Sequence, residues 1–156
     1  MKAKEFYIIN NNCEVLEATN VASEIRELNI RPDEFYWAEL RLEFAGPVIV
    51  SATSFDEAFQ KFKDSGILIQ GGLNPEIDFD IFRNECNVEI RAETLESLLK
   101  KTKNFWYHGG FGKQYLFGKI VLKNGGWFQR VEYDGSECWE FFKTPEEPEW
   151  VKQQEG

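Results

Sequence analysis

The spacing of hydrophobic and polar residues along the chain predicts short strands mixed with amphipathic helices. The clearest strand runs from Glu34 to Phe44, where side-chain character alternates with a period of two. The residues expected on one face are Tyr36, Ala38, Leu40, Leu42 and Phe44. Those expected on the other face are Phe35, Trp37, Glu39, Arg41 and Glu43. The pattern therefore predicts a strand with one face in the core and the other largely in contact with solvent.

Further segments of strand length either alternate or are uniformly apolar. They cover residues 5–10, 14–18, 48–52, 76–81, 87–92, 115–123, 127–133 and 138–142. The runs Asn124-Gly125-Gly126 and Asp134-Gly135 are strong hairpin signals, because asparagine, aspartate and glycine tolerate positive φ. We therefore expect the last three strands to form an antiparallel meander.

Helical spacing appears in three places. Ser54 and Glu57 form a capping box, and Gly66 stands where a left-handed C-terminal cap belongs. The helix between them carries one predicted apolar stripe, formed by Phe55, Ala58, Phe59 and Phe62. Thr94 is expected to cap a second helix with Leu95, Leu98 and Leu99, and a short helix is expected over 21–28.

A chain of 156 residues has the length of one ordinary domain. The element pattern predicts an α+β fold, with a largely antiparallel sheet and two or three helices packed on one face. We expect residues 1–156 to form a single domain. The proline-rich and glutamate-rich stretch 144–156 is expected to be a surface tail, since it cannot continue a central strand.

Composition excludes several classes of protein. No apolar run approaches 18 residues and the N-terminus lacks a signal-peptide pattern, so we expect a cytoplasmic protein with no membrane partner. The 3 cysteines are widely spaced and the chain has 1 histidine, His108, without a recognisable nucleophile or orienting partner. We therefore expect no metal, no cofactor and no enzymatic activity, and activity lost in His108→Ala would overturn the last expectation.

The net charge of −9 is unevenly distributed. Residues 1–99 hold 19 acids and 9 bases, residues 100–131 hold 7 bases and no acid, and residues 132–156 hold 8 acids and 2 bases. The middle segment is also rich in aromatic residues, which is typical of a platform for single-stranded nucleic acid. The surrounding acidic charge opposes phosphate binding, so we expect no nucleic-acid partner. A nucleic-acid-binding module over 100–131 is the alternative function.

Two acidic groups are candidate recognition surfaces. Glu76, Asp78 and Asp80 alternate along one predicted strand, with neighbours about 6.6 Å apart. The second group surrounds the last hairpin and consists of Glu132, Asp134, Glu137 and Glu140, with Trp139 among them. Trp37 is a candidate aromatic anchor, because it shares the charged row of its strand. Asp78 and Asp80 have no recognisable third ligand, so the acids indicate either a solvated acidic face or a recognition surface for a basic protein, rather than a metal site.

A small, acidic, aromatic-rich α+β domain without a cofactor motif resembles in general style the immunity proteins that bacteria pair with polymorphic or contact-dependent toxins. The resemblance covers size, charge and architecture. It implies a non-enzymatic protein that binds and neutralises a cognate, basic nuclease-type toxin domain through an acidic surface. Exposed aromatic residues and strand edges are also compatible with a homodimer.

Overall fold

The computed structural model describes residues 3–66, 80–110 and 112–143, and within them three sheets and three helices. The five-stranded sheet has the order β11-β10-β9-β4-β7, with bounds β4 Phe35–Leu42, β7 Val88–Ala92, β9 Leu116–Leu122, β10 Gly126–Tyr133 and β11 Ser136–Lys143. The four-stranded sheet has the order β2-β1-β5-β6, with bounds β1 Glu5–Ile9, β2 Val15–Glu17, β5 Val48–Ala52 and β6 Ile81–Arg83. The two-stranded sheet pairs β3 Thr19–Asn20 with β8 Trp106–Tyr107. All these strand pairings are antiparallel, so the α+β expectation is confirmed.

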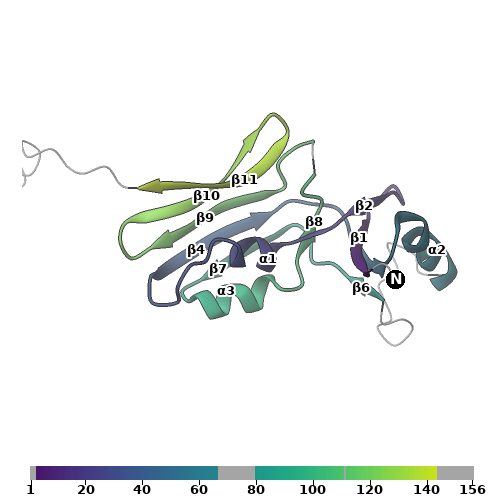
Figure 1. Ribbon diagram of the computed structural model, residues 1–156, viewed down its shortest axis with the longest axis horizontal. Helices are drawn as coiled ribbons and strands as arrows, with labels where there is room; N and C mark the ends of the chain where they lie inside the picture. Colours follow the sequence, from purple (N-terminus) through teal and green to yellow (C-terminus); the bar gives the residue numbers. More distant parts are fainter. Residues whose placement is uncertain (1–2, 67–79, 111, 144–156) are drawn as a thin grey trace, which may run out of the picture.

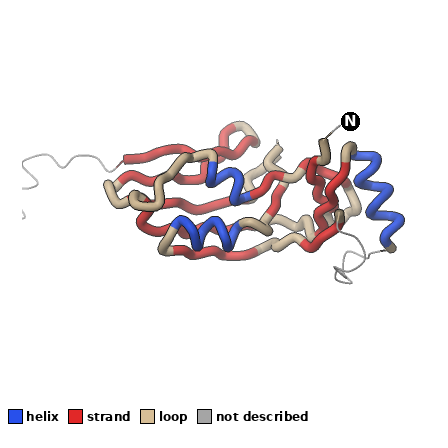
Figure 2. Tube along the Cα trace, turned by 60° about the horizontal axis from the view of Figure 1, so that its bottom comes forward, coloured by secondary structure: helices blue, strands red, loops and turns tan. Residues whose placement is uncertain are grey.

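Two of the helices lie over one face of the five-stranded sheet (Figures 1 and 2). They are α1, Val21–Arg26, and α3, Leu95–Thr102. Ile25 of α1 and Leu98 of α3 are buried in the same cluster as Leu40 and Ile120 of the sheet. Asn20 and Thr94 cap these helices by accepting hydrogen bonds from backbone N–H groups in the first turn, as expected for such side chains. The cluster is the main hydrophobic core.

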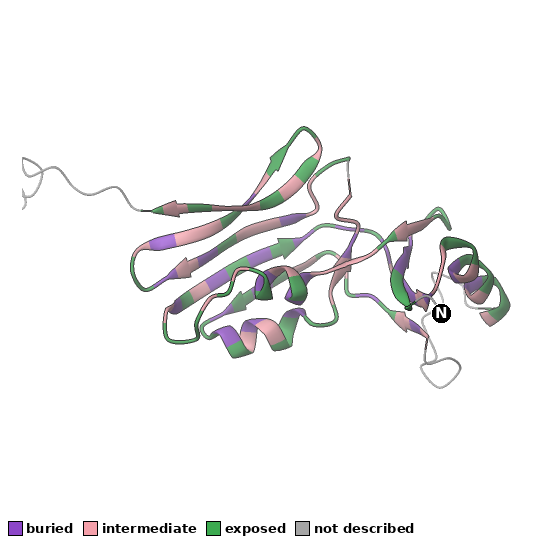
Figure 3. Ribbon diagram, in the orientation of Figure 1, coloured by how far each residue is buried: buried purple, intermediate pink, exposed green. Residues whose placement is uncertain are grey.

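The alternation predicted for β4 is correct over most of its length, as Figure 3 shows. Ala38, Leu40 and Leu42 are buried. The expectation for the start of the strand is wrong, because Phe35 is 2% exposed and Tyr36 is 58% exposed. The register with β9 shifts between Phe35 and Trp37, and the extra residue of such a β-bulge reverses which side chains face the core.

The third helix, α2, Phe55–Ser65, packs on the four-stranded sheet rather than beside α1 and α3 (Figure 1). Its ends are as predicted, since Ser54 accepts a hydrogen bond from the N–H of Glu57 and Gly66 has a φ of 68°. Its predicted apolar stripe is only half buried. Ala58 and Phe62 pack against the sheet, whereas Phe55 and Phe59 are 47% and 42% exposed. The prediction of two or three helices on one face of a largely antiparallel sheet is therefore met by α1 and α3, whereas the second sheet that carries α2 was not predicted.

A buried asparagine, Asn84, connects the segment after β6 with the loop between β4 and β5 and with β8. Its Nδ2 donates to the carbonyl oxygens of Gly46 and Trp106 at 2.6 and 2.9 Å, and its Oδ1 accepts from the N–H of Trp106 at 2.9 Å. These bonds satisfy backbone groups where no strand ladder continues. Ile8 and Ile49 of the four-stranded sheet also belong to the main core, so the two sheets share apolar contacts.

The hairpin turns match the sequence signals. Asp134 and Gly135 have φ values of 50° and 83°, and Gly125 has a φ of 92°. The predicted tail 144–156 and residues 76–79 of the predicted acidic strand lie outside the described residues. Within the described part of the chain, no helix has the length and apolar character that a membrane span requires.

Candidate functional site

The face of the five-stranded sheet opposite α1 and α3 is covered by no helix or strand of the described residues (Figures 1 and 2). Side chains that alternate with the core positions form this surface, which we call the open face. Its members are Trp37, Glu39, Arg41, Glu89, Arg91, Glu93, Phe117, Lys119, Val121, Trp127, Gln129, Glu140 and Phe142. All of them are exposed or partly exposed, so four consecutive strand pairings present a continuous surface to a partner.

An apolar row crosses the open face at one end. Strand register places Trp37 of β4 beside Val121 of β9, Val121 beside Trp127 of β10, and Trp127 beside Phe142 of β11. The rings of Trp127 and Phe142 are stacked at 5.5 Å with an interplanar angle of 16°. At about 4.8 Å between strands, the apolar row extends over about 14 Å. Such an aromatic strip on an uncovered sheet is typical of an interface anchor.

A row of charged and polar side chains, the charged row, runs parallel to the apolar row, displaced from it by two residues along each strand. Across the strands from β7 to β11 its members are Arg91, Glu39, Lys119, Gln129 and Glu140. The guanidinium of Arg91 lies 3.1 Å from the Glu39 carboxylate, and the ammonium of Lys119 lies 5.4 Å from the centre of the Trp37 ring. Exposed ion pairs contribute little to the stability of a fold. The charged row is therefore better suited to selecting a binding partner than to stabilising the protein.

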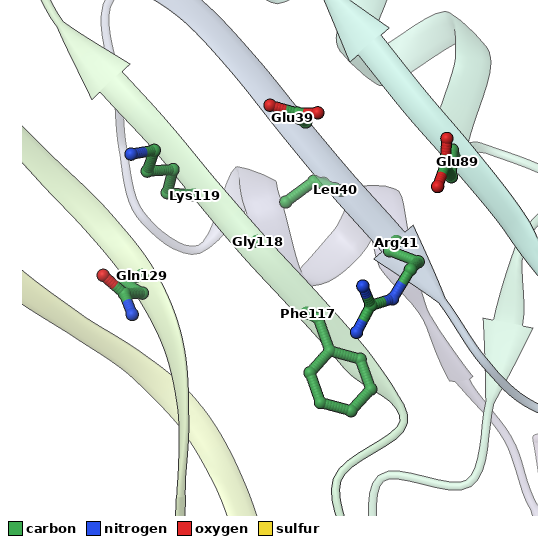
Figure 4. Close-up of a pocket in the computed structure, with 8 residues that line it drawn as sticks. All are labelled: Glu39, Leu40, Arg41, Glu89, Phe117, Gly118, Lys119 and Gln129. Carbon is green, nitrogen blue, oxygen red and sulfur yellow. The ribbon is translucent and has the colours of Figure 1, made fainter.

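A hollow of about 340 Å³ opens beside the charged row (Figure 4). Its base includes Leu40 and Gly118, and its rim carries the carboxylates of Glu39 and Glu89. The Arg41 side chain points toward the Phe117 ring, and its guanidinium carbon lies 4.8 Å from the ring centre. A second hollow of about 550 Å³, on the side of β4 toward β7 and α3, is lined in part by Trp37 and Glu93. The open face therefore has two hollows as well as apolar and charged side chains.

The predicted hairpin acids occupy different environments. Glu132 accepts a hydrogen bond from the N–H of Gly135 at 2.6 Å, and Glu140 accepts one from the Tyr133 hydroxyl at 2.7 Å. Asp134 is an exposed turn residue. Three of the four acids remain at least partly accessible, and Glu140 alone belongs to the open face.

Glu137, the fourth hairpin acid, has a side chain only 1% exposed. Its carboxylate lies 2.6 Å from Nη2 of Arg130 and accepts hydrogen bonds from the N–H groups of Tyr115 and Leu116 at 2.8 and 3.2 Å. Trp139 lies against the same guanidinium, with 4.9 Å between the ring centre and the guanidinium carbon. The structure therefore places Glu137 and Trp139 in an internal cluster rather than on an acidic surface.

Sequence reasoning missed Arg130, whose side chain is 1% exposed. Its Nη2 also donates to the hydroxyl of Tyr107 at 3.0 Å, and its Nη1 lies 3.8 Å from the Glu24 carboxylate. Burial raises the pKa of Tyr107, which keeps the phenol protonated. The available signal was the period of β10, which puts Arg130 on the same face as Phe128, toward the core.

Of the remaining predicted acids, only Asp80 is among the described residues, and it does not join the hairpin. Glu76 and Asp78 lie outside the described residues, and Asp80 lies beside the four-stranded sheet. The Asp80 carboxylate is 2.9 Å from the ammonium of Lys61 and 3.1 Å from that of Lys4. Hydrogen bonds from these two groups lower the pKa of Asp80. Asp80 therefore links β6 to α2 and the N-terminal segment.

Asp80→Asn is expected to lower the free energy of unfolding by about 1–2 kcal/mol at neutral pH. A carboxyl whose pKa is lower in the folded state stabilises the fold above its unfolded pKa of about 4, and this contribution is lost as pH falls through the lowered folded-state pKa. Urea unfolding across this range should show the difference between variant and wild type shrinking with acid. Asp33→Asn, at an exposed pair with Arg31, serves as the control, and a pH-independent difference for Asp80→Asn would contradict the assignment.

No group of three or more His, Cys, Asp or Glu side chains suited to a metal ion occurs among the residues that the structure describes. His108 Nδ1 lies 3.1 Å from the carbonyl oxygen of Glu17, a backbone contact. The predicted basic segment is divided: Tyr107 is in the core, whereas Phe117, Lys119 and Trp127 lie on the open face. Of the predicted site residues described above, Trp37 and Glu140 are the two on the open face.

The comparisons with known proteins give no match: no family model, no curated protein and no solved structure resembles this chain to a significant degree. Inference about function therefore depends on the residues and geometry of the chain itself. The open face is the surface with the strongest features for binding, because it combines an uncovered sheet, an apolar row and a charged row.

Proposed function

We propose that this protein is a non-enzymatic immunity protein that binds and neutralises a cognate toxin domain, and that the open face is its binding surface. The observation that carries the proposal is the apolar row on a sheet face with no covering element among the described residues. A row of partly exposed aromatic side chains of this size typically contributes to an interface.

The composition of the open face supports a protein partner. Trp37, Trp127 and Phe142 supply rigid area at low entropic cost, and charged side chains lie along one side of them. A group of aromatic side chains bordered by polar ones is typical of specific protein interfaces. A partner that covered the apolar row would also cover the charged row and gain specificity from it.

The charge of the chain supports a basic partner. A net charge of −9 attracts cationic proteins over long distances and accelerates their association. Nuclease-type toxins have basic clefts that attract phosphate, so an acidic inhibitor complements them. The resemblance in size, charge and architecture to toxin immunity proteins points in the same direction.

Single-stranded nucleic acid is the alternative partner of the open face. The cations that lie over Phe117 and Trp37 would favour base stacking beside a positive charge. Against this, Arg41 is paired with Glu43 at 2.9 Å and Arg91 with Glu39 at 3.1 Å, so phosphate would have to displace carboxylates. Absence of binding to single-stranded oligonucleotides at low salt would exclude this alternative.

Trp127→Ala is expected to weaken binding of the cognate toxin domain, which the proposal places in a gene adjacent to this one, by about 30-fold or more, the scale of an aromatic anchor. Phe59→Ala is the matched control, because this aromatic residue is 42% exposed on α2, away from the open face. Affinity measured by calorimetry and survival of cells that co-express the toxin domain should both fall for Trp127→Ala alone.

Two results would contradict the proposal. Wild-type protein that neither binds nor protects against the adjacent toxin domain would remove the immunity function. Loss of protection on reversing the charges of Glu132 and Asp134, with full protection by Trp127→Ala, would assign binding to the hairpin tip and not to the open face. Circular dichroism and urea unfolding of each variant would establish that the fold is intact.

A further inference from the structure

Two carboxylates on the open face have neither an ion-pair nor a hydrogen-bond partner within the described part of the chain. Glu39 pairs with Arg91, and the Glu140 carboxylate accepts from a tyrosine hydroxyl. Glu89 and Glu93 make no such contact with any described side chain, and both are exposed. Their charges are therefore available to a partner.

Both carboxylates lie along the β7 edge of the open face, at the margins of its two hollows. Glu89 lines the hollow of about 340 Å³, and Glu93 lines the hollow of about 550 Å³ together with Trp37. The register of β4 with β7 places Ala38 opposite Ala92, which puts Glu93 next to Trp37 at the end of the apolar row. Four residues of strand separate the two acids by about 13 Å.

The unpaired acids restrict what can cover the apolar row. A partner seated on Trp37 also removes water from the adjacent Glu93, and burying a carboxylate without a cation is strongly unfavourable. The same holds for Glu89 if the partner fills the other hollow. A partner that supplies a cation at each position avoids this penalty and gains charge-assisted hydrogen bonds.

We propose that the partner is a protein surface with two basic side chains about 13 Å apart, one pairing with Glu89 and the other with Glu93. The cation at Glu93 stands beside an apolar group that covers Trp37. This inference rests on the proposed function, and it moves the acidic contacts of the toxin complex from the hairpin to the β7 edge.

Other occupants fit these charges less well. A nucleic acid or an anionic membrane would bring phosphate toward two unpaired carboxylates. A second copy of the chain would have to supply its own open-face cations, but Arg41 and Arg91 are engaged with Glu43 and Glu39. Lys119 lies over the Trp37 ring. A basic protein surface is therefore the occupant that satisfies both carboxylates.

The test compares Glu89→Lys and Glu93→Lys with Glu96→Lys, which makes the same charge change at an exposed position on α3. Calorimetric titration with the adjacent toxin domain should show each open-face variant binding at least about tenfold more weakly, and the double variant at least about a hundredfold more weakly. Glu96→Lys should stay within about threefold of wild type, since it alters only the long-range field.

Equal affinities for Glu93→Lys, Glu89→Lys and Glu96→Lys, with tight binding by wild type, would overturn this inference while leaving the proposed function intact. Failure of the wild-type protein to bind any toxin domain would remove the proposed function and this inference with it. A wild-type dimer in sedimentation experiments that either open-face variant dissociates would assign the face to a second copy and overturn the proposal.

Discussion

Arg130→Met is expected to lower the free energy of unfolding by about 3–5 kcal/mol. The substitution keeps an apolar stem of similar length but leaves the Glu137 carboxylate, 1% exposed, without its cation. It also removes the hydrogen bond to the Tyr107 hydroxyl. Urea unfolding followed by tryptophan fluorescence would measure the change, with the slope against denaturant checked for constancy.

Arg41→Met is the matched control, because this arginine is paired at an exposed site with Glu43 and should contribute less than about 1 kcal/mol. The double variant Arg130→Met/Glu137→Gln should recover a large part of the lost stability. It removes both charges, and the single glutamine oxygen can still accept from one of the two backbone donors, the N–H of Leu116. Equal destabilisation by Arg130→Met and Arg41→Met would show that the internal cluster is not important for folding.

Gly118→Ala is expected to destabilise the protein by about 2–5 kcal/mol. Gly118 has a φ of 116°, a conformation that L side chains rarely adopt, and a Cβ atom there would collide with the carbonyl oxygen of Glu39. The same atom would lie 2.8 Å from the Cα of Leu40. The cost combines backbone strain with forced separation of β4 and β9, and thermal unfolding would measure it.

Gly66→Ala separates these two contributions. Gly66 also has a positive φ, of 68°, but a Cβ atom added there would meet nothing within 4 Å. Its loss should be about 1 kcal/mol, the cost of the left-handed conformation alone. A loss for Gly118→Ala no larger than that for Gly66→Ala would mean that β4 and β9 move apart without penalty.

Local sequence signals predicted most of the elements. Ser54, Gly66 and Thr94 mark helix ends in the structure as their side chains suggested, because a cap depends on hydrogen bonds within one turn. The turn at Asp134 and Gly135 was equally readable from the tolerance of these residues for positive φ. The start of β4 was not predictable, since a β-bulge depends on the partner strand rather than on the strand itself.

Less of the candidate site than of the fold could be predicted from the sequence. Trp37 was identified because an aromatic residue in a charged row of one strand is visible in the sequence. Its neighbours Val121, Trp127 and Phe142 were not connected to it, because they come from three other strands whose register the sequence does not specify. Glu137 looked like a surface acid, and only the approach of Arg130 and the start of β9 explains its burial.

The sequence by itself determined the α+β class, the caps, the hairpin turns and the alternation of β4, because each depends on residues close together in the chain. It also determined the net charge of −9 and its division along the chain. Only the tertiary structure decided which acids lie on a surface and which in the core, which helices cover which sheet, and which side chains form the apolar row. These depend on contacts between strands far apart in sequence, where register and burial are set by packing rather than by local preference.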